Sequence, residues 1–222
     1  MEPKVLYEDA EILVLDKPAG LQVIPDRHAE RETLRAWLEK NYKETHIVHR
    51  IDRETSGVIV VAKTEKAFEF LKNQFKNRQV QKTYRAFVHG AIKDERGIID
   101  KPIGSARGGL GPRSARRPYG AVRDAVTTYR TLATSHSGLA TSYVEVFPKT
   151  GRTHQIRVHF AAIQHPILCD ALYAPGRPAL LGFERLALHA LSLRFMHPNG
   201  KEVDFKAPLP KDFVAAEKLL TQ

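Results

Sequence analysis

The sequence predicts an α+β fold, because segments typical of strands and segments with helical spacing follow one another along its 222 residues. The β-branched run at residues 57–62 has the length and composition of a strand that is covered on both faces. A segment with helical spacing follows it directly at residues 65–76. Because no repeat, low-complexity tail or flexible linker divides the chain, we expect one domain over residues 1–222.

The first half of the chain predicts four strands and two helices. Leu34, Trp37 and Leu38 have the spacing of one face of an amphipathic helix. Thr64 is suited to cap the second helix, and Leu71 lies on its apolar face. The predicted elements are strands at residues 5–7 and 12–15, a helix at 32–42, a strand at 57–62, a helix at 65–76 and a strand at 80–88.

The second half predicts a strand, a short helix, a hairpin and a last helix. Ile156 and Phe160 have the spacing of one helical face, and Asn199-Gly200 is a strong signal for a tight hairpin turn. The predicted elements are a strand at residues 141–147, a helix at 156–163, two hairpin strands at 191–196 and 203–205, and a helix at 211–221.

The charge balance favours a polyanionic partner. The chain has 35 Lys and Arg against 25 Asp and Glu, so its formal net charge is +10, and such an excess promotes contact with phosphate backbones. A basic globular protein without such a partner remains the alternative. Residues 105–120 carry four arginines, four glycines and two prolines. They predict a mobile surface loop that either lies over a phosphate backbone or is merely solvated.

Composition also bears on the compartment. The single cysteine, Cys169, excludes an internal disulfide framework and a cysteine-rich zinc site. The N-terminus has no apolar signal-peptide core, and no apolar run is long enough to span a bilayer. We therefore expect a cytoplasmic protein that does not associate with membranes.

Two polar segments, residues 49–57 and 149–159, carry more functional groups than a turn requires. Each is predicted at an end of a strand, where a rigid scaffold presents reactive side chains. In the first segment Asp52 lies between Arg50 and Arg53, and such neighbours keep a carboxylate ionised as a nucleophile or base. A structural ion pair that holds the loop is the alternative.

The histidines and one tyrosine allow weaker hypotheses. The pairs at positions 46 and 49 and at 154 and 159 could ligate a metal, but no zinc-enzyme spacing or acidic cluster accompanies them. Histidines with satisfied hydrogen bonds are therefore favoured over a metal site. Tyr84 is more typical of a packing residue than of a base-stacking residue, and the neighbouring Lys82 and Arg85 add some weight to the second role.

Together these segments resemble the RluA-type family of RNA pseudouridine synthases, over about residues 5–210. The resemblance rests on three motifs in the family's order: His-Arg-Ile-Asp-Arg-Glu-Thr-Ser-Gly at 49–57, Lys-Thr-Tyr at 82–84 and Thr-Gly-Arg-Thr-His-Gln-Ile-Arg-Val-His at 150–159. The chain departs from the family at Ile51, where leucine is usual. It departs again at Cys-Asp-Ala-Leu-Tyr-Ala, residues 169–174, where Gly-Asp-x-x-Tyr-Gly is usual.

The resemblance implies a mixed, largely antiparallel central sheet flanked by helices, and an isomerase that converts uridine in RNA to pseudouridine. It implies that Asp52 is the catalytic carboxylate, that Arg157 pairs with it and that Tyr84 packs on the target base. Arg50 would fill the gap left by a flipped-out nucleotide. We expect RNA contacts from the following residues: Arg50, Arg53, Thr55, Lys82, Arg113, Arg116, Arg117, Arg152, His154 and Gln155.

Further expectations concern partners. The resemblance implies no metal and no organic cofactor, and a structured RNA substrate, either tRNA or a ribosomal stem-loop. The chain begins at the first catalytic-domain strands, so we expect a stand-alone catalytic domain without an S4 domain. We also expect a monomer without an obligate protein partner. Two alternatives are an RNA-binding module that keeps the fold without catalysis, and a metal-dependent hydrolase built on the histidines.

Overall fold

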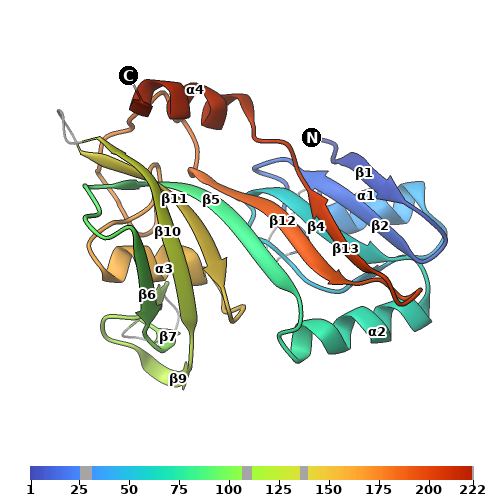
Figure 1. Cartoon of the computed structure of the whole chain (residues 1–222). Coiled ribbons are helices and arrows are strands. Elements are labelled where there is room, and N and C mark those ends of the chain that lie inside the picture. The colour runs from blue at the N-terminus through green and yellow to red at the C-terminus, as the bar shows by residue number, and fades with distance from the viewer. Residues whose placement is uncertain (26–31, 107–111, 136–139, 222) are drawn as a thin grey trace. The chain divides into compact units, whose positions relative to one another are not determined.

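The computed structural model describes residues 1–25, 32–106, 112–135 and 140–221. The chain forms two compact units, each built from two separate segments (Figure 1). The first unit comprises Met1–Lys82 and His189–Pro208, and the second comprises Thr83–Leu188 and Leu209–Gln222. A single domain over residues 1–222 remains a prediction.

The first unit is built on a mixed sheet with the strand order β1-β2-β4-β12, in which β3 also pairs with β4 and β13 with β12. Among the strand pairs of this unit in the described ranges, β4 and β12 run parallel and the other pairs are antiparallel. Every residue of β4 is buried, as its β-branched sequence predicts. The strands are β1 (Lys4–Glu8), β2 (Ile12–Lys17), β3 (His46–Ile47), β4 (Ser56–Ala62), β12 (Leu188–Met196) and β13 (Glu202–Lys206).

Two capped helices, α1 (Leu34–Asn41) and α2 (Glu65–Lys76), belong to the first unit. The hydroxyl of Thr64 accepts a hydrogen bond from the amide of Ala67 at 3.1 Å, which confirms the predicted cap. The buried face of α2 also includes a polar residue, Gln74, whose amide exchanges two 2.8 Å hydrogen bonds with the backbone of Met196. That contact fixes the helix against the hairpin.

The second unit has an antiparallel sheet with the order β5-β11-β10-β6. On one face Phe87 stacks on Tyr143 at 4.3 Å and lies 5.6 Å from Phe213 of the last helix. On the other face Tyr129 lies 5.4 Å from Phe160 of α3. The elements are β5 (Gln81–His89), β6 (Arg96–Asp100), β10 (Val126–Ser135), β11 (Thr141–Pro148), α3 (Gln155–Ala162) and α4 (Lys211–Thr221).

The segment at residues 105–120 differs from the predicted mobile loop. Its described part contributes to a small sheet of β7 (Ile103–Ser105), β8 (Arg113–Ser114) and β9 (Tyr119–Arg123), in the order β8-β7-β9. Ala115 is buried in a cluster with Ile103 and with Val158 of α3. The prediction of a loop was wrong for this part, because strand pairing, the burial of Ala115 and hydrogen bonds to Tyr173 and Ala161 hold it in a sheet. Residues 107–111 lie outside the described residues.

The predicted fold class is confirmed: the protein is α+β, with mixed and mostly antiparallel sheet pairing. Strands β6 and β10 were not predicted; β10 has only a partial alternation, and its register shifts between Thr131 and Ala133. Within the described ranges, no helix has the length and apolar character needed to cross a membrane.

Candidate functional site

The first motif segment places Asp52 at the start of a tight turn just before β4. The amide of Thr55 donates to the carbonyl of Asp52 at 3.1 Å, which closes the turn. Asp52 is half-buried, whereas Arg50 and Arg53 are exposed. The side chain of Arg53 pairs with Glu54 at 2.6 Å on the surface. The turn thus presents a carboxylate that is partly shielded from water between two exposed cations.

A buried lysine holds this turn through main-chain atoms. The ammonium of Lys17, which is fully buried, donates to the carbonyl oxygens of Pro18, Leu21 and Arg53 at 2.9, 2.7 and 3.0 Å. The amide of Gly20 donates to the same Arg53 carbonyl at 2.8 Å. Lys17 was not among the predicted site residues, because nothing in the local sequence around it indicates a contact with the distant Arg53.

Two residues at the end of the motif are structural. Gly57 has φ +115°, and a Cβ atom there would lie 2.1 Å from the carbonyl oxygen of Ala190, so only glycine permits this approach of β4 and β12. Thr55 is 1% exposed, and its hydroxyl has no hydrogen-bond partner in the part of the chain that the structure describes. Its burial contradicts the predicted direct RNA contact.

The histidine of the first motif is neutral and packed. His49 Nε2 accepts the amide of Val60 at 3.1 Å, and the ring stacks on Phe75 with centroids 4.4 Å apart. Burial, and to a lesser extent the nearby positive Lys82, lowers the pKa of His49 to about 3. Burial, with a smaller contribution from Arg78, lowers the pKa of Lys82 to about 8, so Lys82 is mostly protonated at neutral pH.

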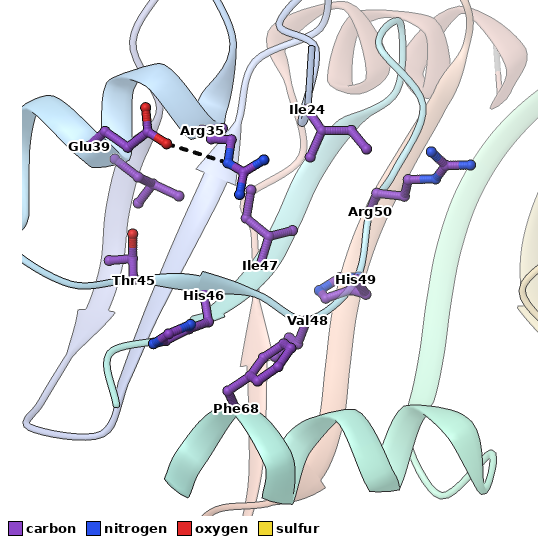
Figure 2. Close-up of a pocket in the computed structure, with 11 residues that line it drawn as sticks. Ile24, Arg35, Glu39, Thr45, His46, Ile47, Val48, His49, Arg50 and Phe68 are labelled. Atoms are coloured by element: carbon purple, nitrogen blue, oxygen red, sulfur yellow. Dashed lines mark ion pairs between the residues drawn. The ribbon is translucent and has the colours of Figure 1, made fainter. Parts of the chain in front are cut away.

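A pocket of about 480 Å³ lies beside the chain segment that leads to Asp52 (Figure 2). Arg50 belongs both to the motif and to the pocket wall. On α1 the exposed Arg35 and Glu39 form an ion pair at 3.4 Å, and the ring of His46 stacks on Phe68 of α2 at 5.3 Å. The wall is completed by the following residues: Ile24, Leu38, Thr45, Ile47, Val48 and His49.

In the second unit, Arg157 on α3 forms a bidentate ion pair with Asp170. Its Nε and Nη2 atoms donate to the two carboxylate oxygens of Asp170, each at 2.8 Å. The side chains of Arg157 and Asp170 are 9% and 0% exposed. Asp170 was not among the predicted site residues, although it lies in the segment at residues 169–174, where the chain departs from the family pattern.

Tyr173 extends this ion pair toward the small sheet. The guanidinium of Arg157 lies 5.2 Å from its ring centroid, in cation–π geometry. The Tyr173 hydroxyl lies 3.0 Å from Nδ1 of His154 and accepts the backbone amide of Arg113 at 3.1 Å. His154, the residue before α3, has a left-handed backbone with φ 55°. His154, Arg157 and Arg113, three predicted site residues, are thus linked through Tyr173.

Gln155 organises the loop before α3 from inside the protein. Its Oε1 accepts the Thr150 hydroxyl at 2.6 Å and the Arg152 amide at 3.0 Å. Its Nε2 donates to the Val126 carbonyl and the Thr127 hydroxyl, both at 3.0 Å. All four hydrogen-bonding positions of the amide are therefore used. Because Gln155 is also 4% exposed, the predicted RNA contact is corrected to a structural role.

Tyr84 lies on the same face of its sheet as α3. The strand register pairs Tyr84 with Val146 and Val146 with Tyr129, and residues directly opposite one another share a face. Tyr129 in turn contacts Phe160 of α3. The second unit therefore brings half-buried Tyr84 to the side of the sheet that is covered by the helix carrying Arg157.

The remaining predicted RNA contacts in the second unit lie on or near its surface. The guanidinium of Arg116 donates to the Ala161 carbonyl at the end of α3 at 2.6 Å. Arg113 is exposed and donates to the Ser105 hydroxyl at 3.2 Å, and Arg117 is exposed on the same segment. Arg152 donates to the Asp124 carbonyl at 3.1 Å.

The four histidines considered as metal ligands each have a hydrogen-bond partner within the protein. Fully buried His159 contacts the Thr127 hydroxyl and the Lys101 carbonyl, both at 2.9 Å. His46 lies 3.0 Å from Glu44. Over the residues that the structure describes, no three His, Cys, Asp or Glu side chains form a group that could hold a metal ion.

Comparison with known proteins identifies the family. The family model described as RNA pseudouridylate synthase matches residues 11–162. The chain belongs to the RNA pseudouridylate synthase family. It is 38% identical to the dual-specificity RNA pseudouridine synthase RluA of Yersinia pestis, over 91% of this chain and 97% of that protein. It is 40% identical to an uncharacterized RNA pseudouridine synthase of Mycobacterium tuberculosis, over 97% of this chain and 72% of the relative.

Solved structures agree with this membership. The human RNA pseudouridylate synthase domain containing 4 matches with a TM-score of 0.77 and 29% identity, over 98% of this chain and 93% of that one. The human RNA pseudouridylate synthase domain containing 1 matches with a TM-score of 0.79 and 27% identity, over 94% and 84% of the two chains. The predicted RluA-type resemblance is confirmed, and the protein is an isomerase that acts on RNA to form pseudouridine.

Proposed function

We propose that this pseudouridine synthase isomerises specific uridines of tRNA, ribosomal RNA or both, with Asp52 as the catalytic carboxylate acting on a flipped-out uridine. The observation that carries the proposal is the position of Asp52. It begins a turn inside the family motif at residues 49–57, it is half-buried, and main-chain hydrogen bonds fix the turn. Such a turn holds the residue that bears the carboxylate in place through main-chain atoms.

The chemistry that this carboxylate must support is a redox-neutral rearrangement. The bond between N1 of uracil and C1′ of ribose breaks, a bond between C5 and C1′ forms, and the proton of C5 is lost to solvent while N1 gains one. An anionic carboxylate can act in this sequence as a nucleophile or as a base. A uridine in a stacked stem or loop must first leave the stack, which costs a few kcal/mol that backbone contacts can offset.

The names of relatives support RNA as substrate, and one of them names the large ribosomal subunit. One relative, from Zymomonas mobilis, is named ribosomal large subunit pseudouridine synthase D and is 37% identical over 98% of this chain and 72% of its own length. The RluA relatives are named as dual-specificity enzymes. We infer that this chain also modifies a structured RNA, and that the pairing of Arg157 with Asp52 and the packing of Tyr84 on the base assist it.

In this proposal the exposed cations of the protein contact the phosphate backbone of the RNA. Arg50 in the first unit and Arg113 and Arg117 in the second are exposed, and the formal net charge of +10 acts in the same direction. Arg53, Arg116, Arg152 and His154, which also have partners within the protein, belong to the same proposed contact set. Lys82, which is mostly protonated at neutral pH, completes the set.

The test is the release of tritium from RNA labelled at C5 of uridine, with and without a chelator. We expect the wild-type protein to release tritium in both conditions, and Asp52→Asn to lower turnover by more than a thousandfold while RNA retention on a filter stays within about threefold. Asp94→Asn, which changes an exposed aspartate, is the matched control and should keep wild-type turnover.

Three outcomes would contradict the proposal. RNA retention without tritium release by the wild-type protein would indicate an RNA-binding module. Loss of activity with the chelator would indicate metal-dependent chemistry. Turnover of Asp52→Asn within about tenfold of wild type, equivalent to roughly 1.4 kcal/mol of barrier, would remove Asp52 from the catalytic role.

A further inference from the structure

The ion pair of Arg157 with Asp170 lies entirely within the second unit, and its geometry is restrictive. Two parallel hydrogen bonds of 2.8 Å fix the guanidinium plane as well as its position. These bonds involve the Nε and Nη2 atoms of Arg157, so the edge of the guanidinium that faces away from Asp170 also has a defined orientation. A single bond, or a lysine in place of arginine, would not define that orientation.

Asp170 is itself held rigidly. Besides the guanidinium, its Oδ1 accepts the backbone amides of Leu172 and Tyr173, each at 3.0 Å. The carbonyl of Asp170 accepts the amide of Ala174 at 2.8 Å, which continues the turn. With no side-chain exposure, the carboxylate has little room to move. The fold therefore fixes the orientation of the Asp170 carboxylate, and the two hydrogen bonds to that carboxylate fix the orientation of the Arg157 guanidinium.

Tyr173, three residues along the same turn, restrains Arg157 from a second side. Its ring faces the guanidinium at 5.2 Å. Its hydroxyl is anchored by His154 and by the backbone amide of Arg113 on β8. In the turn at residues 170–173, Asp170 and Tyr173 both contact Arg157 of α3. Tyr173 also contacts the small basic sheet, so the turn connects α3 to that sheet.

We infer that Asp170 is a positioning residue for pseudouridine formation: it fixes the orientation in which the Arg157 guanidinium takes part in the reaction, and Tyr173 supports the same orientation. The inference rests on the proposed function, in which Arg157 assists catalysis. Asp170 itself is buried behind Arg157 and does not touch substrate.

The first experiment compares Asp170→Asn with a matched control in the same unit. Asp212→Asn breaks another arginine–aspartate pair, in which Arg185 Nε lies 2.7 Å from Asp212, far along the chain from the motif. We expect Asp170→Asn to lower kcat by about 100-fold, equivalent to roughly 2.7 kcal/mol of barrier, with KM within about threefold. Asp212→Asn should keep kcat within about twofold. Melting curves establish that each variant is folded at the assay temperature.

The second experiment separates orientation from charge. Asp170→Glu keeps the negative charge but moves it by one methylene, so a positioning role predicts a kcat lowered by about tenfold in a folded protein, whereas a purely electrostatic or structural role predicts recovery to wild type. This variant also carries the test if Asp170→Asn does not fold. In an Arg157→Lys background, Asp170→Asn should lower kcat by less than about twofold more, because the group it positions is gone.

The outcomes are distinct from those of the proposed function. If the wild-type protein forms no pseudouridine, the proposed function fails and the inference fails with it. If the wild type is active, a wild-type kcat in folded Asp170→Asn or Asp170→Glu overturns the inference alone. Full multiplicative effects of the two changes in the double variant would also overturn it, since Asp170 would then act independently of Arg157.

Discussion

The two motif segments of this protein are held in place by different kinds of atoms. In the first unit, the turn that carries Asp52 is fixed by main-chain carbonyls that bind Lys17 and the amide of Gly20. In the second unit, the segment before and within α3 is fixed by side chains, with Gln155 binding four groups and Arg157 binding Asp170. The first segment is thus held mainly through main-chain atoms, and the second mainly through the side chains of its own motif.

A loop held by its backbone can present its own side chains without using them for stability. The turn that carries Asp52 is held largely through main-chain atoms, so substitutions of its side chains should alter function more than folding. In a loop that is held by its side chains, most of those side chains form hydrogen bonds within the protein. Gln155 is therefore structural although it lies in a functional motif, and the free energy of unfolding should depend strongly on it.

The largest effect on stability is expected at the main-chain approach in the first unit. Gly57→Ala places a Cβ atom 2.1 Å from a backbone oxygen at φ +115°, so we expect the free energy of unfolding to fall by more than about 3 kcal/mol. Gly200→Ala is the matched control, with φ +87° and open space around the added Cβ, and should cost about 1 kcal/mol. Denaturant unfolding measures the free energy of unfolding of both variants. Equal losses would show that the close approach of β4 to β12 at Gly57 does not stabilise the first motif.

The next effect tests the side-chain network in the second unit. Gln155→Met keeps the length of the side chain but removes its bonds to Thr150, Arg152, Val126 and Thr127. We expect the free energy of unfolding to fall by about 2–4 kcal/mol, because buried groups lose their partners. The control Gln81→Met, at an exposed position of β5, should change it by less than about 0.5 kcal/mol. A similarly small change for Gln155→Met would contradict the contrast between the two segments.

The smallest effect is a pH dependence in the first unit. Burial lowers the pKa of His49 from 6.5 to about 3, so between these values the unfolded chain binds a proton that the folded chain does not. Stability from this group is present above pH 6.5 and is lost as the pH falls toward 3. Between pH 7 and pH 5 the loss is about 2 kcal/mol.

His49→Gln checks this effect, because glutamine keeps an acceptor for the amide of Val60 but does not titrate. The free energy of unfolding of the variant, measured in urea at pH 7 and pH 5, should fall by about 2 kcal/mol less than that of the wild type. Since every other titrating group is shared by the two proteins, an equal fall in both would show that His49 takes up its proton in the folded state as readily as in the unfolded one.

Much of the fold followed from local pattern. Helix α2 begins and ends where the spacing and Thr64 predicted, and β4 is buried as its β-branched run predicted. Strands β6 and β10 and the small basic sheet were missed, because their sequences are polar or glycine-rich and their order depends on pairing with distant segments. Ala115, for example, is ordered by an apolar contact with Val158 of α3.

The candidate site divides in the same way. The sequence by itself determined the family, the three motifs and the residues that present charge. Each motif is a set of residue types at a fixed local spacing, which can be recognised without knowing how remote segments pack. Only the tertiary structure decided that Lys17 holds the Asp52 turn, that Gln155 and Thr55 are buried, and that Asp170 binds Arg157. Each of these depends on two polar atoms meeting within about 3 Å. That distance is set by how remote segments pack, which local spacing does not encode.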